Sequence, residues 1–270
     1  MLGPIKLDLA LAADGHPVAL ELSLQQQTFN IALNESSTGY QVTLQATDWK
    51  PALKPALKIN NLKASGQLLA DRLHLEKIIV NAYQGEATGN LIMNWKDSWK
   101  LDSRFELSSL NLGLLLKALG DNALDGTASG NFTLRSLADS PAKLIDNSHL
   151  LGDAMISNGH IYNADLEQAV RTLSSEWQGG GQTPFEVIKS HVDATPVRIR
   201  LRQLEIKSSI LAAKGKLDIN QLDKLNGTIN VGLEESTGLV NMPLMIAGTV
   251  ENPKVRPTDE ALAGAAVGTA

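Results

Sequence analysis

The sequence predicts a mainly β protein with a long antiparallel sheet and a few short α-helices. Apolar residues alternate with polar ones along most of the 270-residue chain, which is typical of strands with one apolar face. The clearest stretch is Ile199–Leu233, which has three alternating runs separated by short turns. It aligns without a gap on Leu73–Leu107. Two strand meanders with similar turn lengths align by period alone, so the alignment predicts a shared architecture and leaves common descent open.

The composition restricts the classes of function. Hydrophobic residues make up 43% of the chain but aromatic residues only 4%, so the apolar surface is mostly aliphatic. A net charge of -5 offers no broad positive surface for a phosphate backbone, and we expect no nucleic-acid partner. The absence of cysteine excludes disulfides, thiolate catalysis and cysteine zinc sites. The length allows one large β domain or two smaller ones.

The sequence predicts neither a membrane helix nor a signal peptide before its first strand. No stretch approaches the roughly 20 apolar residues of a membrane helix, and the strand pattern begins directly after residues 1–4. We expect the chain to be soluble as it stands and to be a piece of a longer protein.

The first half of the chain predicts a meander with two interruptions. Four strands are expected in 5–47, with a hairpin turn at Asp14-Gly15 and successive antiparallel pairing. Two prolines in 48–58 predict that this segment lies outside the sheet or caps its edge. Four further strands are expected near Leu62 and in 73–83, 88–95 and 99–107. The apolar run 110–119 predicts a short buried helix or turn, and 126–134 predicts another strand.

The second half predicts helices between strands. Ser140-Pro141 is typical of a helix start and predicts a helix to about Leu150. A hairpin is expected in 153–162, turning at Asn158-Gly159, followed by an amphipathic helix in 165–177. The Gly-rich segment 178–182 predicts a flexible loop, and Thr183-Pro184-Phe185-Glu186 predicts a helix to about His191.

Strands resume at Ala194 and include a last strand at 243–250. Ile199 and Leu201 are out of phase with Leu204 and Ile206, so we expect a bulge near Arg202-Gln203. The end of the chain, 258–270, is rich in small residues and is expected to be a flexible tail.

No motif in the sequence indicates catalysis. The five histidines are scattered without metal-ligand spacing, Gly179–Gly181 lacks the Gly-Lys-Ser/Thr of a phosphate loop, and there is no GxSxG. We therefore expect no enzyme activity, cofactor or metal. Trp95 and Trp99 flank a turn, where they favour two rings packed at a sheet end over contact with a lipid headgroup.

The amount of one-sided apolar surface is the remaining signal. A sheet of twelve or so strands covers its apolar face either by closing into a sandwich or barrel, or by curving into a trough that holds a ligand. The period of the sequence does not separate these solutions.

Three segments resemble the C-terminal region of the AsmA family. They are Gly126–Leu134 (GTASGNFTL), Asn158–Leu166 (NGHIYNADL) and Ile246–Thr258 (IAGTVENPKVRPT), in the order of that family's motifs. The resemblance implies a long curved antiparallel sheet that forms a U-shaped or taco-like groove. It also implies a periplasmic location, a tether to the inner membrane through a helix outside this sequence, and kinship with TamB-like bridge proteins. The family brings no catalytic residues, and this chain is much shorter than the bridge-forming members.

The function implied is a lipid-binding groove that contributes to phospholipid transport between the inner and outer membranes and to outer-membrane homeostasis. We expect a phospholipid or another acyl-chain lipid as ligand, and an outer-membrane or periplasmic protein as a further partner. The alternative is a periplasmic scaffold that assists outer-membrane protein assembly by pairing a sheet edge with a client strand.

The groove is predicted to run through two continuous segments, 1–125 and the AsmA-like 126–257 with its helical insertions, before the tail at 258–270. One face of the paired meanders is predicted to line it, with a closed core as the competing interpretation of these residues. The predicted lining residues are Leu91, Met93, Phe105, Leu107, Leu217, Ile219, Ile229, Val231 and Leu233.

Overall fold

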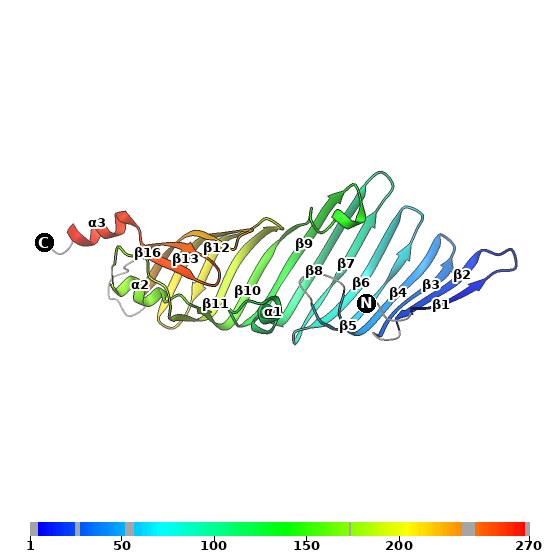
Figure 1. Cartoon of the computed structure of the whole chain (residues 1–270), viewed down its shortest axis with the longest axis horizontal. Helices are drawn as coiled ribbons and strands as arrows, with labels where there is room; N and C mark the ends of the chain where they lie inside the picture. The colour runs from blue at the N-terminus through cyan, green and yellow to red at the C-terminus, as the bar shows by residue number, and fades with distance from the viewer. Residues whose placement is uncertain (1–4, 25–27, 52–56, 173, 234–240, 268–270) are drawn as a thin grey trace. The chain divides into compact units, whose positions relative to one another are not determined.

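A single antiparallel sheet makes up most of the chain. The computed structural model describes residues 5–24, 28–51, 57–172, 174–233 and 241–267. Within them it has one 16-stranded antiparallel sheet and three short α-helices, which confirms the predicted mainly β fold. The strands lie in the sheet in the order of the chain (Figure 1), so the predicted successive pairing is also confirmed.

The strands differ in length from five to 14 residues. They are β1 Ile5–Leu11, β2 Pro17–Leu24, β3 Thr28–Ser36, β4 Gly39–Trp49, β5 Ile59–Leu68, β6 Arg72–Ala82, β7 Gly85–Asn94, β8 Trp99–Asn111, β9 Thr127–Ala138, β10 His149–Tyr162, β11 Gln182–Thr195, β12 Arg198–Lys207, β13 Leu211–Asn220, β14 Leu225–Leu233, β15 Met242–Gly248 and β16 Pro253–Pro257. The helices are α1 Leu112–Leu119, α2 Leu166–Thr172 and α3 Asp259–Val267, the last lying within the predicted tail.

The chain divides into two compact units. The N-terminal unit comprises residues 1–110 and 131–149, and the C-terminal unit comprises 111–130 and 150–270. The predicted boundary between residues 125 and 126 falls inside the first segment of the C-terminal unit.

In the N-terminal unit the register places the apolar residues of neighbouring strands directly opposite one another. Leu33 pairs with Val42, Val42 with Gly66, and Gly66 with Leu75. Directly opposed residues share a face of the sheet, so these apolar residues form continuous rows across the strands. Gly66 is required in its row because a Cβ there would overlap the backbone of His74.

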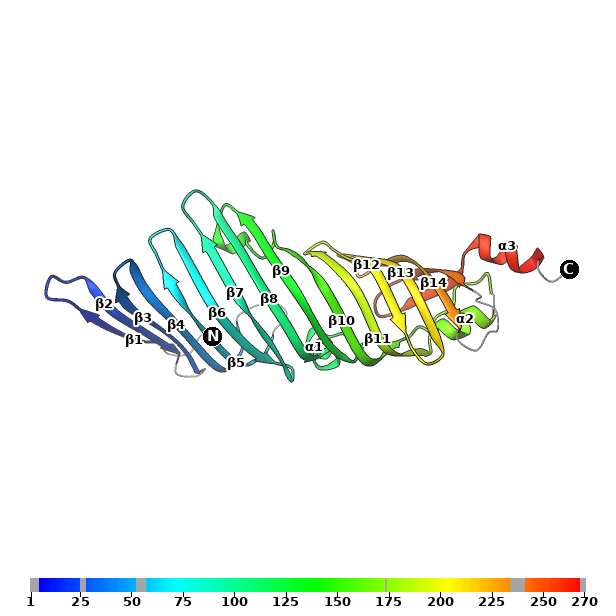
Figure 2. The same ribbon diagram turned by 180° about the vertical axis from the view of Figure 1, so that it is seen from behind.

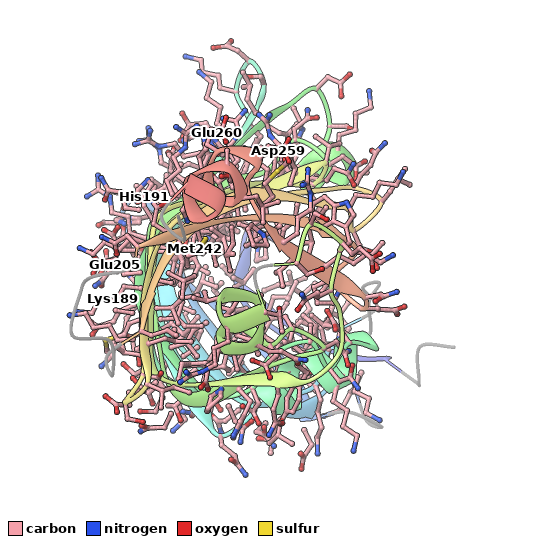
Figure 3. The ribbon with its side chains drawn as sticks, turned by 90° about the vertical axis from the view of Figure 1, so that its left-hand side faces the viewer. Lys189, His191, Glu205, Met242, Asp259 and Glu260 are labelled. Atoms are coloured by element: carbon pink, nitrogen blue, oxygen red, sulfur yellow. The ribbon has the colours of Figure 1, made fainter. Side chains whose placement is uncertain are left out.

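In the C-terminal unit α2 packs on the apolar face of the sheet. Leu166, Ala169 and Val170 of α2 belong to one buried cluster with residues of β11 to β16. Figure 3 shows α2 against one side of these strands, with Lys189, His191 and Glu205 on the other side. This unit therefore has a conventional core between a sheet and a helix.

The predicted bulge in β12 is confirmed. The register between β12 and β13 shifts between Leu201 and Leu204, and Gln203 has a φ of 50°. The shift returns Leu204 to the face that Leu201 occupies. The register of β6 with β7 shifts at the aligned place, between Leu75 and Ile78, so the two aligned hairpins share this irregularity.

Two predicted helices are wrong. Ser140-Pro141 begins only a 3-10 turn, Pro141–Lys143, and the Ser140 side chain makes no capping hydrogen bond. Residues 183–191 lie in strand β11. The hydroxyl of Thr183 instead donates to the carbonyl of Ala164 and accepts from the amide of Leu166, so it caps α2 rather than a helix of its own.

The predicted hairpin in 153–162 is also wrong, because β10 runs without a break through Asn158-Gly159. Asn158 adopts a φ of 53°, which makes a local irregularity instead of a chain reversal. A Cβ on Gly159 would overlap the carbonyl of Asp125, so the glycine allows a neighbouring segment to approach closely.

The helix predicted at 110–119 forms as α1, but none of its residues is buried, so that part of the prediction is wrong. The Asn111 side chain caps its start and Gly120, with a φ of 86°, ends it. Over the described ranges, no helix combines the length and the apolar character that crossing a membrane requires.

Candidate functional site

The rows of the N-terminal unit join into an aliphatic band that crosses β1 to β8. Each row has one residue from every strand, and consecutive members pair directly. The first row is Leu9, Leu20, Leu33, Val42, Gly66, Leu75, Leu91 and Ser103, and the second is Leu7, Leu22, Ile31, Leu44, Ala64, Ile78, Gly89 and Phe105. We call these 16 residues the aliphatic band.

The band contains no charged side chain and a single polar one. The hydroxyl of Ser103 donates to the carbonyl of Asn90 at 2.7 Å, so it is satisfied within the sheet. The opposite face is polar, as in the row Asn34, Gln41, Gln67 and His74. The N-terminal unit is therefore strongly two-faced.

Within the described residues of the N-terminal unit, neither an α-helix nor a second sheet layer covers the band. Val42, Ala64 and Leu75 are buried by their neighbours, but Leu33, Leu44 and Leu91 are only partly buried. Leu7 and Leu9 are 57% and 51% exposed. A contiguous apolar surface of this kind is typical of an interaction site.

Four predicted lining residues lie on this face. Leu91 and Phe105 belong to the band itself, and Met93 and Leu107 pair with Leu101 and Ala87 in the rows beside it. All four are partly exposed. Sequence reasoning missed Phe132, whose ring stacks on Phe105 with centroids 5.4 Å apart. It also missed the band residues of β1 to β6, although their period-two alternation was the signal that predicted the strands.

The other five predicted lining residues share one face of the C-terminal unit, but their surroundings differ. Ile229 and Val231 are 2% and 0% exposed and belong to the core cluster that includes α2. Leu217 and Leu233 pack against that cluster, and Ile219 lies half-buried opposite Ile199. A ligand reaches Ile229 and Val231 only if this core opens.

The two tryptophans predicted at a sheet end pack on each other. The rings of Trp95 and Trp99 lie 5.6 Å apart, and the Trp95 indole donates to the carbonyl of Ala70 at 3.1 Å. The favoured interpretation, two rings packed at a sheet end, is confirmed.

A polar cluster that linear spacing did not reveal surrounds Asp125. One carboxylate oxygen accepts from the amide of His160 at 2.6 Å, and the other accepts from the hydroxyl of Tyr162 at 2.7 Å. Desolvation raises the pKa of Asp125, but these two hydrogen bonds outweigh it and hold the pKa below its ordinary value of 3.8. Asp125 therefore stays ionised at neutral pH.

Two other histidines also lie beside carboxylates. His191 contacts Asp153 at 3.0 Å, and His16 contacts Asp14 and Glu35. In the part of the chain that the structure describes, no group of three or more His, Cys, Asp or Glu residues is placed to hold a metal ion.

Comparison with known proteins found no match: no family model, curated protein or solved structure matches the chain.

Proposed function

We propose that the chain binds the acyl chains of phospholipids along the aliphatic band of its N-terminal unit. The observation that carries the proposal is that two rows of residues, apolar except for Ser103, cross eight strands. Within the described residues of the N-terminal unit, neither an α-helix nor a second sheet layer covers them. In the protein as a whole, the band would be the wall of a curved groove in a periplasmic, inner-membrane-anchored, AsmA-like protein. Its role would be to contribute to phospholipid transport between the two membranes and to outer-membrane homeostasis.

The proposed mechanism is passive. Burying one CH₂ group contributes about 0.8 kcal/mol, so several methylene groups on the band offset removal of an acyl chain from a bilayer. The band has no charged anchor, and its one hydroxyl is already bonded to Asn90. An acyl chain therefore meets similar aliphatic surroundings from β1 to β8, which permits it to slide from strand to strand.

A second candidate function has one observation in its favour. Strand β1 pairs with β2 alone among the described strands, and its Leu7, Leu9 and Leu11 are all more than half exposed. An exposed apolar edge of this kind can pair with a strand of another protein. The proposal of a scaffold for outer-membrane protein assembly rests on the unpaired side of β1, although Leu7 and Leu9 also belong to the band.

Mass spectrometry of organic extracts from protein purified without detergent tests the lipid proposal. We expect phospholipid in extracts of the wild-type protein and its loss in Leu44→Glu, because a carboxylate on the band would have to be desolvated beside an acyl chain. Thr43→Glu is the matched control, since Thr43 neighbours Leu44 and lies on the opposite face.

Circular dichroism of both variants checks that each is folded. Absence of lipid from the wild-type extract would contradict the lipid proposal and favour the scaffold. If folded Leu44→Glu and Thr43→Glu contained equal amounts of lipid, the lipid would not be bound on the band.

A further inference from the structure

A cavity of about 600 Å³ lies in the C-terminal unit between α1 and the end of β10. Figure 2 shows α1 beside that end of β10. The cavity is lined by Gly113, Lys117, Gly120, Asp121, Asn122, Leu124, Asp125 and Tyr162. It thus brings together one cation, two carboxylates, a phenol and an aliphatic side chain.

The loop that carries both carboxylates is held at each end. Its start is fixed where the amide of Asp121 donates to the carbonyl of Leu116 at 2.9 Å. Its end is fixed by an isolated bridge of Leu124 with Ile161 and by the bonds of Asp125 to β10. The carboxylates are therefore in place before a ligand arrives.

Both carboxylates keep capacity to accept further hydrogen bonds. In Asp121, Oδ1 accepts from the amides of Asn122 and Ala123 at 2.6 and 2.8 Å. The other oxygen, Oδ2, accepts neither of these hydrogen bonds. In Asp125, Oδ1 accepts from the amide of His160 and lies 3.4 Å from the imidazole Nδ1 of the same residue. Oδ2 accepts only from the hydroxyl of Tyr162, whereas a carboxylate has about four acceptor positions.

The Lys117 side chain is exposed, and none of the ion pairs among the described residues includes it. The same helix carries two exposed leucines. Leu114 and Leu119 on α1 are 41% and 40% exposed, and neither belongs to a core cluster. The cavity is thus lined by charged groups, and α1, one of the elements that line it, carries exposed leucines elsewhere on its surface.

We propose that this cavity binds a zwitterionic phospholipid headgroup in which a phosphate is joined to a primary amine. The ammonium of Lys117 would pair with the phosphate, and the carboxylates of Asp121 and Asp125 would accept hydrogen bonds from the amine. The leucines of α1 would contact the first methylene groups of the acyl chains. This assignment rests on the proposed lipid-binding function and adds the headgroup class to it.

The charged groups of the cavity favour this headgroup class over anionic headgroups, inorganic phosphate and quaternary ammonium headgroups. An anionic headgroup or inorganic phosphate would satisfy Lys117 but would be repelled by the two carboxylates. A quaternary ammonium carries charge but no N–H, so it cannot donate to Asp121 or Asp125. A primary ammonium donates three hydrogen bonds, and charge-assisted bonds of this type are the strong ones.

Vesicle binding tests the assignment. The probes are vesicles of phosphatidylethanolamine and phosphatidylcholine in equal parts, vesicles of phosphatidylcholine alone, and soluble phosphoethanolamine. We expect wild-type protein to bind the mixed vesicles about tenfold more tightly than phosphatidylcholine vesicles, which is the effect of one charge-assisted hydrogen bond. Lys117→Gln and Asp121→Asn are each expected to abolish that preference.

Matched controls remove the same charges elsewhere in the C-terminal unit. Lys207→Gln on β12 and Asp223→Asn in the β13–β14 turn lie outside the cavity and are expected to keep the tenfold preference. If soluble phosphoethanolamine competes with the mixed vesicles, the headgroup alone is sufficient for binding. If the protein prefers the mixed vesicles but phosphoethanolamine does not compete, the acyl chains are also needed. Both results support the assignment.

Equal binding to the two vesicle types, or an unchanged preference in Lys117→Gln and Asp121→Asn, would overturn the assignment. Phospholipid in extracts of the same two variants is measured in parallel. If the preference is absent while lipid still co-purifies, the headgroup site fails and the acyl-chain function stands. If no lipid co-purifies with any form of the protein, the proposed function itself fails.

Discussion

The carboxylate of Asp125 joins segments that lie 35 and 37 positions apart, through the amide of His160 and the hydroxyl of Tyr162. It fixes the loop after α1 to β10 and keeps a negative charge at the cavity. No spacing rule predicts this contact, because it depends on β10 being one continuous strand. The sequence instead indicated a hairpin at Asn158-Gly159, which would have turned His160 and Tyr162 away.

This contact predicts a pH-dependent contribution to stability. The pKa of Asp125 is depressed in the folded state below its ordinary value of 3.8. Its contribution is therefore present above that value and is lost as the pH falls through the folded pKa. We expect Tyr162→Phe to lower the free energy of unfolding by about 1 kcal/mol at pH 7 and by less at pH 3. Urea unfolding at the two pH values measures the difference.

Tyr40→Phe is the control for this experiment. The hydroxyl of Tyr40 donates to the carbonyl of Pro17 at 2.9 Å, a neutral acceptor, so its loss should cost the same at both pH values. A cost for Tyr162→Phe that did not change between pH 7 and pH 3 would argue against an ionised Asp125 as the acceptor.

Strands were predictable because the alternation that defines them is local. A helix after Asp165 was predictable because its apolar residues recur at helical spacing, but α2 covers only Leu166–Thr172 of the predicted 165–177. The errors came from residues whose partners lie elsewhere in the chain. Thr183 and the residues after it have the pattern of a helix start, but the Thr183 hydroxyl is used by α2 and its backbone pairs with β10. A capping signal therefore identifies a residue suited to capping without identifying which helix it caps.

The role of Thr183 can be measured directly. Its side chain is 1% exposed, so Thr183→Val would leave the carbonyl of Ala164 and the amide of Leu166 without this partner. We expect the free energy of unfolding to fall by about 1–3 kcal/mol in urea titrations. Thr228→Val, at an exposed position of β14, should change it by no more than about 0.5 kcal/mol. Similar small effects in both variants would show that Thr183 does not hold α2.

Across the whole molecule, the sequence predicted which alternate residues share a face but not what covers that face. The four predicted lining residues of β7 and β8 share one face of the N-terminal unit, and the five of β13 and β14 share one face of the C-terminal unit. Ile229 and Val231 are nevertheless in a core under α2, whereas Leu91 and Phe105 belong to the uncovered band. Period carries no information on where a helix packs, so covered and uncovered positions look alike in the sequence.

Site-specific photocrosslinking tests directly whether phospholipid lies on the aliphatic band. A photoreactive amino acid at Leu91, on the aliphatic band, is compared with one at Asn90, the adjacent residue on the opposite face. We expect a phospholipid adduct, identified by mass spectrometry, at Leu91 and none at Asn90. No adduct at Leu91, or equal adducts at Leu91 and Asn90, would contradict the lipid proposal.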